Sequence, residues 1–152
     1  YGYNVKYLHN EIGKILGIDR ENNLIVIGGG HLGQAIANYA NFERRGFYIK
    51  AIFDIDPEII GKEVRGVRVY SMDELEDFIK KNDIHIAAMA IPKLQAEEVA
   101  KRLVVAGIVG IWNYAHIDLQ VPDNVVVENV HLSESLMRLS YRVNREMDKT
   151  KK

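Results

Sequence analysis

Three glycines at a fixed spacing are the residues of this chain with the clearest chemical meaning. Residues 28–33 read Gly-Gly-Gly-His-Leu-Gly, a G-x-G-x-x-G pattern that directly follows the apolar residues 24–27. In such a pattern the first glycine permits a tight turn, the second lets the backbone approach a pyrophosphate, and the third allows a helix to pack closely on a sheet. The N-terminus of that helix favours a bound anion. The pattern predicts a dinucleotide-binding turn, and a glycine-rich turn that serves only packing is the alternative.

An acidic residue stands where a nucleotide-binding unit needs one. Asp54 ends the next mostly apolar run, residues 48–53. A carboxylate at this place accepts hydrogen bonds from the adenosine ribose of NAD and repels the 2′-phosphate of NADP. Ile55 supplies no arginine to compensate for that repulsion. We therefore expect NAD(H) rather than NADP(H).

A sheet is needed to position these residues, and the chain alternates strand-like with helix-like segments. This alternation predicts an α/β fold with a Rossmann-like, mostly parallel sheet and helices on both faces. The third strand is expected at an edge of the sheet. The expected strands are residues 24–27, 48–53, 67–70, 84–90, 109–114 and 125–130.

Helix caps and apolar periodicity predict the helices. Asn4 can cap the first helix and Gly17 can end it, while Ser71 and Glu74 form a capping box for a later one. The expected helices are residues 4–17, residues 31–45 including Tyr39, residues 73–81, a segment around residues 96–103, and about twenty residues from Leu132.

The composition is that of one compact globular domain. The chain has 152 residues, of which 47% are hydrophobic and 27% charged, which suffices to bury a core. It has no apolar run of 18 residues and no signal peptide, so we expect a cytoplasmic protein that contacts no membrane. The net charge of −1 gives no general attraction to nucleic acid. Because the chain has no cysteine, a response to redox state would need a bound cofactor.

The last predicted helix has more apolar surface than one sheet can easily cover. Leu136, Leu139, Val143 and Met147 mark one face, and Tyr141 lies off that stripe. A partner chain that covers this helix is the favoured interpretation. Packing of the helix on its own sheet is the alternative.

Five stretches occur in a fixed order along nearly the whole chain. They are residues 2–5 (Gly-Tyr-Asn-Val), 28–33, 53–57 (Phe-Asp-Ile-Asp-Pro), 110–115 (Gly-Ile-Trp-Asn-Tyr-Ala), and 128–130 (Glu-Asn-Val) leading into Leu-Ser-Tyr at 139–141. The glycine turn alone is common to many families, whereas the ordered set is specific. In this set the chain resembles the Rex family of redox-sensing transcriptional repressors of bacteria.

The resemblance implies an architecture and a function. Rex-like proteins are homodimers with an N-terminal winged-helix DNA-binding domain, a C-terminal Rossmann domain and a last helix swapped onto the partner subunit. They repress genes when NADH is scarce, and NADH releases them from operator DNA. The chain, which begins at Tyr1 rather than methionine, would be the sensor half, and operator DNA would be bound only through the absent N-terminal domain. The implied divisions are a linker and leading helix at 1–20, an NAD(H)-binding domain at 21–131, and a dimerisation helix at 132–152.

The resemblance also assigns site residues in three groups. The turn would hold the pyrophosphate, the end of the second strand would bind the adenosine, and the ends of the fourth and fifth strands would line the nicotinamide. For Asn113 and Tyr114, a turn-stabilising amide and a half-buried aromatic are the alternative interpretations. The expected cofactor-binding residues are Gly28, Gly29, Gly30, His31, Leu32, Gly33, Asp54, Ile55, Ala90, Ile91, Pro92, Asn113, Tyr114 and Ala115, with no catalytic and no metal-binding residue.

One residue departs from the family pattern. Where many Rex proteins have Asn-Val-Asp-Leu before the swapped helix, this chain has Asn-Val-His-Leu at 129–132. In better-known members that aspartate takes part in a polar switch between NADH-bound and free dimers. An imidazole can gain a proton near neutral pH, so we hypothesise that His131 makes NADH binding depend on pH. NADH titrations from pH 6 to 8 with wild type and His131→Asp test this, and matching flat curves would refute it.

Three other functions stay open. An NAD-dependent oxidoreductase would need a substrate domain or an acid–base group beside the nicotinamide. The chain is short for a second domain. It also lacks the tyrosine–lysine pair of short-chain dehydrogenases, because none of its tyrosines is followed four positions later by lysine. A CoA-binding domain is disfavoured because Asp54 would meet the 3′-phosphate of CoA. A dimerisation module with a vestigial pocket is the third. We expect a sensor and not an enzyme.

Overall fold

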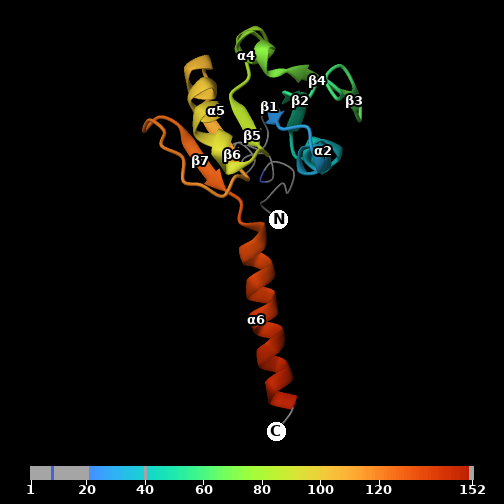
Figure 1. Cartoon of the computed structure of the whole chain (residues 1–152), viewed down its shortest axis with the longest axis vertical. Coiled ribbons are helices and arrows are strands. Elements are labelled where there is room, and N and C mark those ends of the chain that lie inside the picture. Colours follow the sequence, from blue (N-terminus) through green and yellow to red (C-terminus); the bar gives the residue numbers. More distant parts are fainter. Residues whose placement is uncertain (1–7, 9–20, 40, 151–152) are drawn as a thin grey trace.

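A computed structural model of the chain describes residue 8, residues 21–39 and residues 41–150 (Figure 1). The helix predicted at residues 4–17 therefore lies outside the described residues, apart from Leu8.

One seven-stranded sheet forms the centre of the described part, in the order β3-β4-β2-β1-β5-β6-β7. Neighbouring strands are parallel, except that β3 and β4 form an antiparallel pair. The predicted Rossmann-like fold is confirmed. The strands are β1 (Asn22–Ile27), β2 (Phe47–Asp54), β3 (Glu63–Val64), β4 (Val67–Ser71), β5 (Ile86–Met89), β6 (Gly110–Asn113) and β7 (Val126–Asn129).

The prediction that residues 67–70 form an edge strand is wrong. β3 pairs with the outer side of β4 and takes the edge position. The two strands are joined by Arg65 and Gly66, whose φ angles of 52° and 80° suit a two-residue hairpin turn. A strand of two residues is too short to show an alternating pattern in the sequence.

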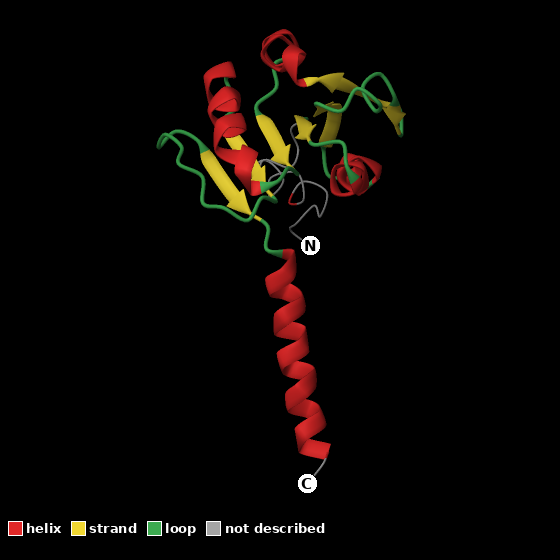
Figure 2. Cartoon of the chain, viewed as in Figure 1, coloured by secondary structure: helices red, strands yellow, loops and turns green. Residues whose placement is uncertain are grey.

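Helices cover both faces of the sheet (Figure 2). The side chains of β1 alternate between them: Ile25 and Ile27 pack with the α4–α5 side, while Leu24 and Val26 pack with the α2 side. The helices are α2 (His31–Asn38) and α3 (Asn41–Arg44) on one face, and α4 (Leu75–Asn82) and α5 (Lys93–Ala106) on the other.

The helix expected over residues 31–45 is interrupted. α2 ends at Asn38, and Tyr39 has an extended backbone (φ −78°, ψ 95°) in place of a helical one. Asparagine favours helix ends because its side chain competes for backbone hydrogen bonds. The ring of Tyr39 packs edge-on against Phe42 of the short α3, with 4.7 Å between the ring centroids.

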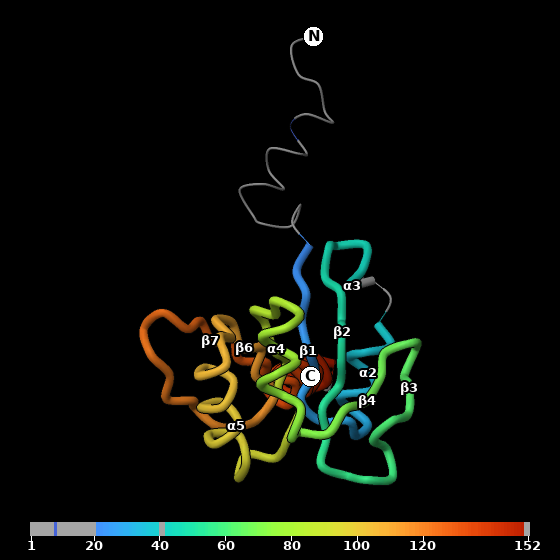
Figure 3. Tube along the Cα trace, turned by 90° about the horizontal axis from the view of Figure 1, so that it is seen from above, coloured from blue at the N-terminus to red at the C-terminus, as the bar shows by residue number. Residues whose placement is uncertain are grey.

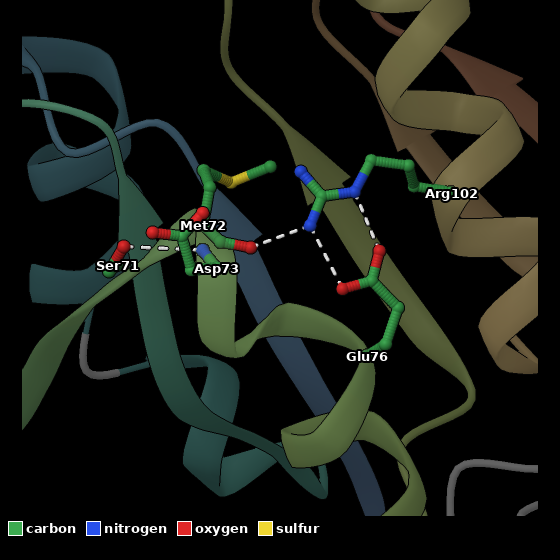
Figure 4. Close-up of polar contacts among 5 residues, drawn as sticks. All are labelled: Ser71, Met72, Asp73, Glu76 and Arg102. Carbon is green, nitrogen blue, oxygen red and sulfur yellow. Dashed lines mark hydrogen bonds and ion pairs between the residues drawn. The ribbon is translucent and has the colours of Figure 1, made fainter.

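The predicted capping box is confirmed at the start of a short 3-10 turn, η1 (Met72–Glu74), which precedes α4. Arg102 of α5 reinforces this start. Its guanidinium donates to the carbonyl of Met72 at 2.6 Å and to both carboxylate oxygens of Glu76 at 2.6 and 2.9 Å (Figure 4). The hydrogen bond from Arg102 lowers the pKa of Glu76 below its usual value. This ion pair joins α5 to the beginning of α4.

The last helix, α6 (Leu132–Thr150), projects from the domain (Figure 1). Figure 3 looks down on the sheet and shows α6 nearly end-on, so the helix leaves the sheet at a steep angle. None of its residues is buried, and Leu136, Leu139 and Val143 of the apolar stripe are 67%, 58% and 46% exposed. The alternative that this helix packs on its own sheet is therefore wrong.

Candidate cofactor site

Gly28 and Gly33 shape the turn between β1 and α2. Gly28 has a φ of +107°, and a Cβ added to it would lie 2.3 Å from the carbonyl oxygen of Ala90. A Cβ on Gly33 would lie 1.7 Å from the carbonyl oxygen of Gly28. Only glycine fits either place. The turn is thus packed closely on both of its neighbours, as the first and third glycines of the pattern predict.

The second glycine of the pattern, Gly30, faces open space, in contrast to Gly28 and Gly33. Gly30 is the N-cap of α2, no side chain caps this end of the helix, and a Cβ on Gly30 would meet nothing within 4 Å. This is the side from which an anionic group can approach the N–H groups at the helix N-terminus.

Asp54 orders the loops on either side of this space. One carboxylate oxygen accepts from the backbone N–H of Gly29 at 2.5 Å, and the other accepts from Ile55 and Asp56 at 2.6 and 3.0 Å. A carboxylate offers about four acceptor positions, so capacity remains for a hydroxyl group of a ligand. The side chain of Ile55 is 74% exposed beside it.

The residues after β5 form the next part of the edge. The backbone N–H of Ala90 donates to Ile27 at 2.8 Å, which holds this segment against the end of β1. Cγ2 of Ile91 would be 3.1 Å from a Cβ on Gly28, and Pro92 is the N-cap of α5. The segment expected to wall the nicotinamide therefore lies directly beside the glycine turn.

Asn113 is wholly buried at the end of β6, and its amide is occupied by protein groups. The nitrogen donates to the carbonyl of Ile117 at 3.0 Å and to the side-chain oxygen of Asn129 at 2.9 Å, while its oxygen accepts from the N–H of Ala115 at 3.0 Å. These contacts fit the turn-stabilising interpretation. Asn113 shapes the segment that carries Tyr114, whose pKa is raised by burial.

Two residues that the sequence analysis did not select support the glycine turn. The side-chain nitrogen of Gln34 donates to the carbonyl of Gly29 at 2.8 Å. Cδ1 of Ile59 would lie 2.7 Å from a Cβ on Gly29. Gln34 stands in the first turn of the helix after the motif, and this position was the only signal in the sequence. No signal identified Ile59, because its contact depends on how the loop after β2 folds back.

His131 lies directly before α6. Its Nδ1 is 3.8 Å from a carboxylate oxygen of Glu134, one helical turn away. The pH dependence expected of His131 stays a prediction.

An apolar groove of about 470 Å³ lies elsewhere, on the α2 face of the sheet. It contains none of the residues predicted to bind the cofactor. We call it the β6 groove, and its lining includes Leu24, Phe42, Ile86, Trp112, Val126 and Glu128.

The described residues contain neither a metal-binding cluster nor a membrane-spanning helix. No three of their histidine, aspartate or glutamate side chains are grouped so that they could hold a metal ion. No helix in this part of the chain is long and apolar enough to cross a membrane.

Comparison with known proteins gives the family. Residues 19–117 match the model of the CoA binding domain family. The Rex repressor of Clostridioides difficile (strain 630) is 59% identical over 141 residues, which are 93% of this chain and 67% of that protein. The Rex repressor of Thermoanaerobacter pseudethanolicus is 55% identical over 146 residues, 96% of this chain and 65% of that protein. The chain thus spans about two thirds of the length of these curated relatives.

Solved structures of Rex-family repressors are similar to this chain as well. The crystal structure of RSP, a Rex-family repressor, is 54% identical, with a TM-score of 0.89 over 99% of this chain and 72% of that one. RSP in complex with β-NADH is 53% identical, with a TM-score of 0.88 over 99% of this chain and 73% of that one. RSP with β-NAD⁺ and operator DNA is 54% identical, with a TM-score of 0.88 over 99% of this chain and 70% of that one. These relatives are named repressors and not enzymes, as expected. The chain belongs to the Rex family of redox-sensing transcriptional repressors.

Proposed function

We propose that this chain is the NAD(H)-sensing and dimerisation part of a cytoplasmic transcriptional repressor. NADH binding shifts the dimer to a state that releases operator DNA. The observation that carries the proposal is the turn at Gly28 and Gly30 with Asp54 beside it, in a chain 53% identical to a repressor solved with NADH. Operator DNA is bound through a winged-helix domain outside this chain.

The cofactor lies along the carboxyl ends of the strands. The pyrophosphate occupies the open space at Gly30, held by residues 28–33, and the adenosine ribose bonds to Asp54 beside Ile55. The nicotinamide lies between residues 90–92 and residues 113–115, with Asn113 acting through the turn that it holds. Support comes from the space at Gly30, the remaining acceptor capacity of Asp54 and the closeness of Ile91 to the glycine turn.

The dimer forms through α6. Its apolar stripe is uncovered in the single chain, and the β6 groove on the face of α2 is apolar and unfilled by described residues. Figure 1 shows α6 leaving the sheet on the same side as α2. A second copy, related by a two-fold axis, would place its α6 against the groove while receiving the first copy's helix in return.

Calorimetric titration of the chain with NADH, NAD⁺, NADPH and CoA tests the cofactor assignment. We expect NADH to bind more tightly than NAD⁺, and NADPH and CoA to bind weakly because of the charge of Asp54. Equal affinities for NADH and NAD⁺ would contradict a sensor of the cofactor ratio. Tightest binding of CoA would favour the function in the name of the matching domain family.

A further inference from the structure

One buried side chain joins the candidate cofactor site to the beginning of α6. Asn113 ends β6, is fully buried, and uses both donor hydrogens and the acceptor of its amide in contacts within the protein. On one side these contacts fix residues 114–117, and on the other they reach Asn129, three residues before α6.

The backbone of Asn113 makes a second link in the same direction. Its carbonyl accepts from the N–H of Val130 at 2.9 Å, and its side chain bonds to Asn129 at 2.9 Å. Because no residue of α6 is buried against the domain, the direction in which α6 leaves depends on how residues 129 and 130 are held. Both are held by Asn113.

A row of backbone hydrogen bonds along the carboxyl ends of the parallel strands connects the glycine turn with the start of α6. In each bond, the residue that follows one strand donates to the last or next-to-last residue of a neighbouring strand. These bonds are Gly28 N–H to Phe53 at 2.8 Å, Ala90 N–H to Ile27 at 2.8 Å, Tyr114 N–H to Met89 at 2.9 Å, and Val130 N–H to Asn113 at 2.9 Å.

We infer that Asn113 and Asn129 are positioning residues that transmit cofactor binding to the orientation of α6. The inference rests on the proposed function, because it requires a cofactor that touches residues 113–115. When the cofactor contacts this turn, the Asn113 amide moves with it, and the bonds to Asn129 and Val130 carry the movement to α6. The two helices of the dimer then change their relative position.

Asn129 offers a clean substitution because it is exposed, whereas Asn113 is buried. Asn129→Ala removes the acceptor and leaves the Asn113 nitrogen with Ile117 alone. Asn129→Asp keeps an acceptor oxygen and is the matched control.

Distances between spin labels measure the movement. Because the chain has no cysteine, Lys101→Cys on α5 and Asn144→Cys on α6, both exposed, give two labelling sites. Labelled protein is mixed with excess unlabelled protein so that each dimer has one labelled copy. NADH affinity is measured on the same samples, and thermal unfolding is followed separately.

We expect NADH to shift the distance between the labels in wild type. In Asn129→Ala, NADH should leave this distance unchanged, although the variant binds NADH with an affinity within about threefold of wild type. Asn129→Asp should restore the shift. A full shift in Asn129→Ala, with only a lower unfolding temperature, would show a merely structural role and overturn the inference. A wild type that binds NADH without any shift would also overturn it, whereas a wild type that does not bind NADH would refute the proposed function itself.

Discussion

Gly28 and Gly30 belong to the same turn but have different neighbours. Gly28→Ala should destabilise the fold by at least about 2 kcal/mol, because the new Cβ would collide with the carbonyl of Ala90 at a positive φ. Gly30→Ala should leave stability nearly unchanged and reduce NADH affinity more than about tenfold, because its methyl group enters the space proposed for the pyrophosphate. Urea unfolding and NADH titration of both variants measure this. A Gly30→Ala variant with wild-type affinity would place the pyrophosphate elsewhere.

The charge of Asp54 is proposed to select the cofactor. Asp54→Asn should weaken NADH binding by about tenfold, the value of one charge-assisted hydrogen bond. It should also reduce the preference for NADH over NADPH, because the repulsion of the 2′-phosphate is lost. Asp56→Asn is the control, since among the described residues its carboxylate accepts a hydrogen bond only from the nearby N–H of Glu58. The ratio of the two dissociation constants is the measurement, and an unchanged ratio in Asp54→Asn would exclude this role.

The sequence predicted those residues whose place depends on local geometry. It could not predict contacts whose two partners come from distant segments of the chain. The turn at Gly28 and the place of Asp54 at the end of a strand follow from short-range patterns. The commitment of the Asn113 amide to Ile117 and Asn129 does not, because it requires that β7 lie beside β6 and that the loop between them fold back.

At the scale of elements, strands and long helices were predictable, and their ends and interruptions were not. The central strand β1 reads as an apolar run because it is buried on both faces. The short β3 has too few residues for a periodic signal. The end of α2 at Asn38 is a local event: Tyr39 takes an extended backbone and its ring packs on Phe42, and the apolar spacing, which continues through Tyr39, does not record this change.

The contact of α5 with the start of α4 should make stability depend on pH. Arg102 lowers the pKa of Glu76 in the folded protein relative to its ordinary value of 4.5. The stabilisation is therefore complete above that ordinary value and is lost as the pH falls through the lower, folded value. Arg102→Met should remove this part of the acid sensitivity and cost about 1 kcal/mol near pH 7, since both side chains are about one-third exposed.

Arg65→Met is the matched control for this pair. Arg65 lies 3.7 Å from Glu43, and both side chains are more exposed, so its loss should change stability little. Urea unfolding at pH 3.5, 5 and 7 compares the variants. Equal losses for Arg65→Met and Arg102→Met would show that the Arg102 contact has no special stabilising role.

At the scale of the whole molecule, the exposed α6 is the feature that a single chain does not explain. Its apolar periodicity predicted a covered face, and the structure leaves that face uncovered while providing the apolar β6 groove on the side toward which α6 leaves. The sequence could not predict the groove, because its lining comes from β1, α3, β2, β5, β6 and β7, which meet only in the folded sheet.

A charge placed in the apolar stripe should separate the two copies. Leu139→Glu should weaken dimerisation at least about 100-fold, because the carboxylate would be buried in the interface without a partner. Arg138→Glu, which places a carboxylate on the side of α6 opposite the stripe, should leave the dimer intact. Since both positions are exposed in the single chain, neither variant should reduce the stability of the Rossmann domain. Sedimentation equilibrium across micromolar concentrations gives the mass of each variant, and thermal unfolding verifies the fold. If Leu139→Glu keeps the dimer mass, the copies associate through a surface other than the stripe, and the β6 groove requires a different occupant.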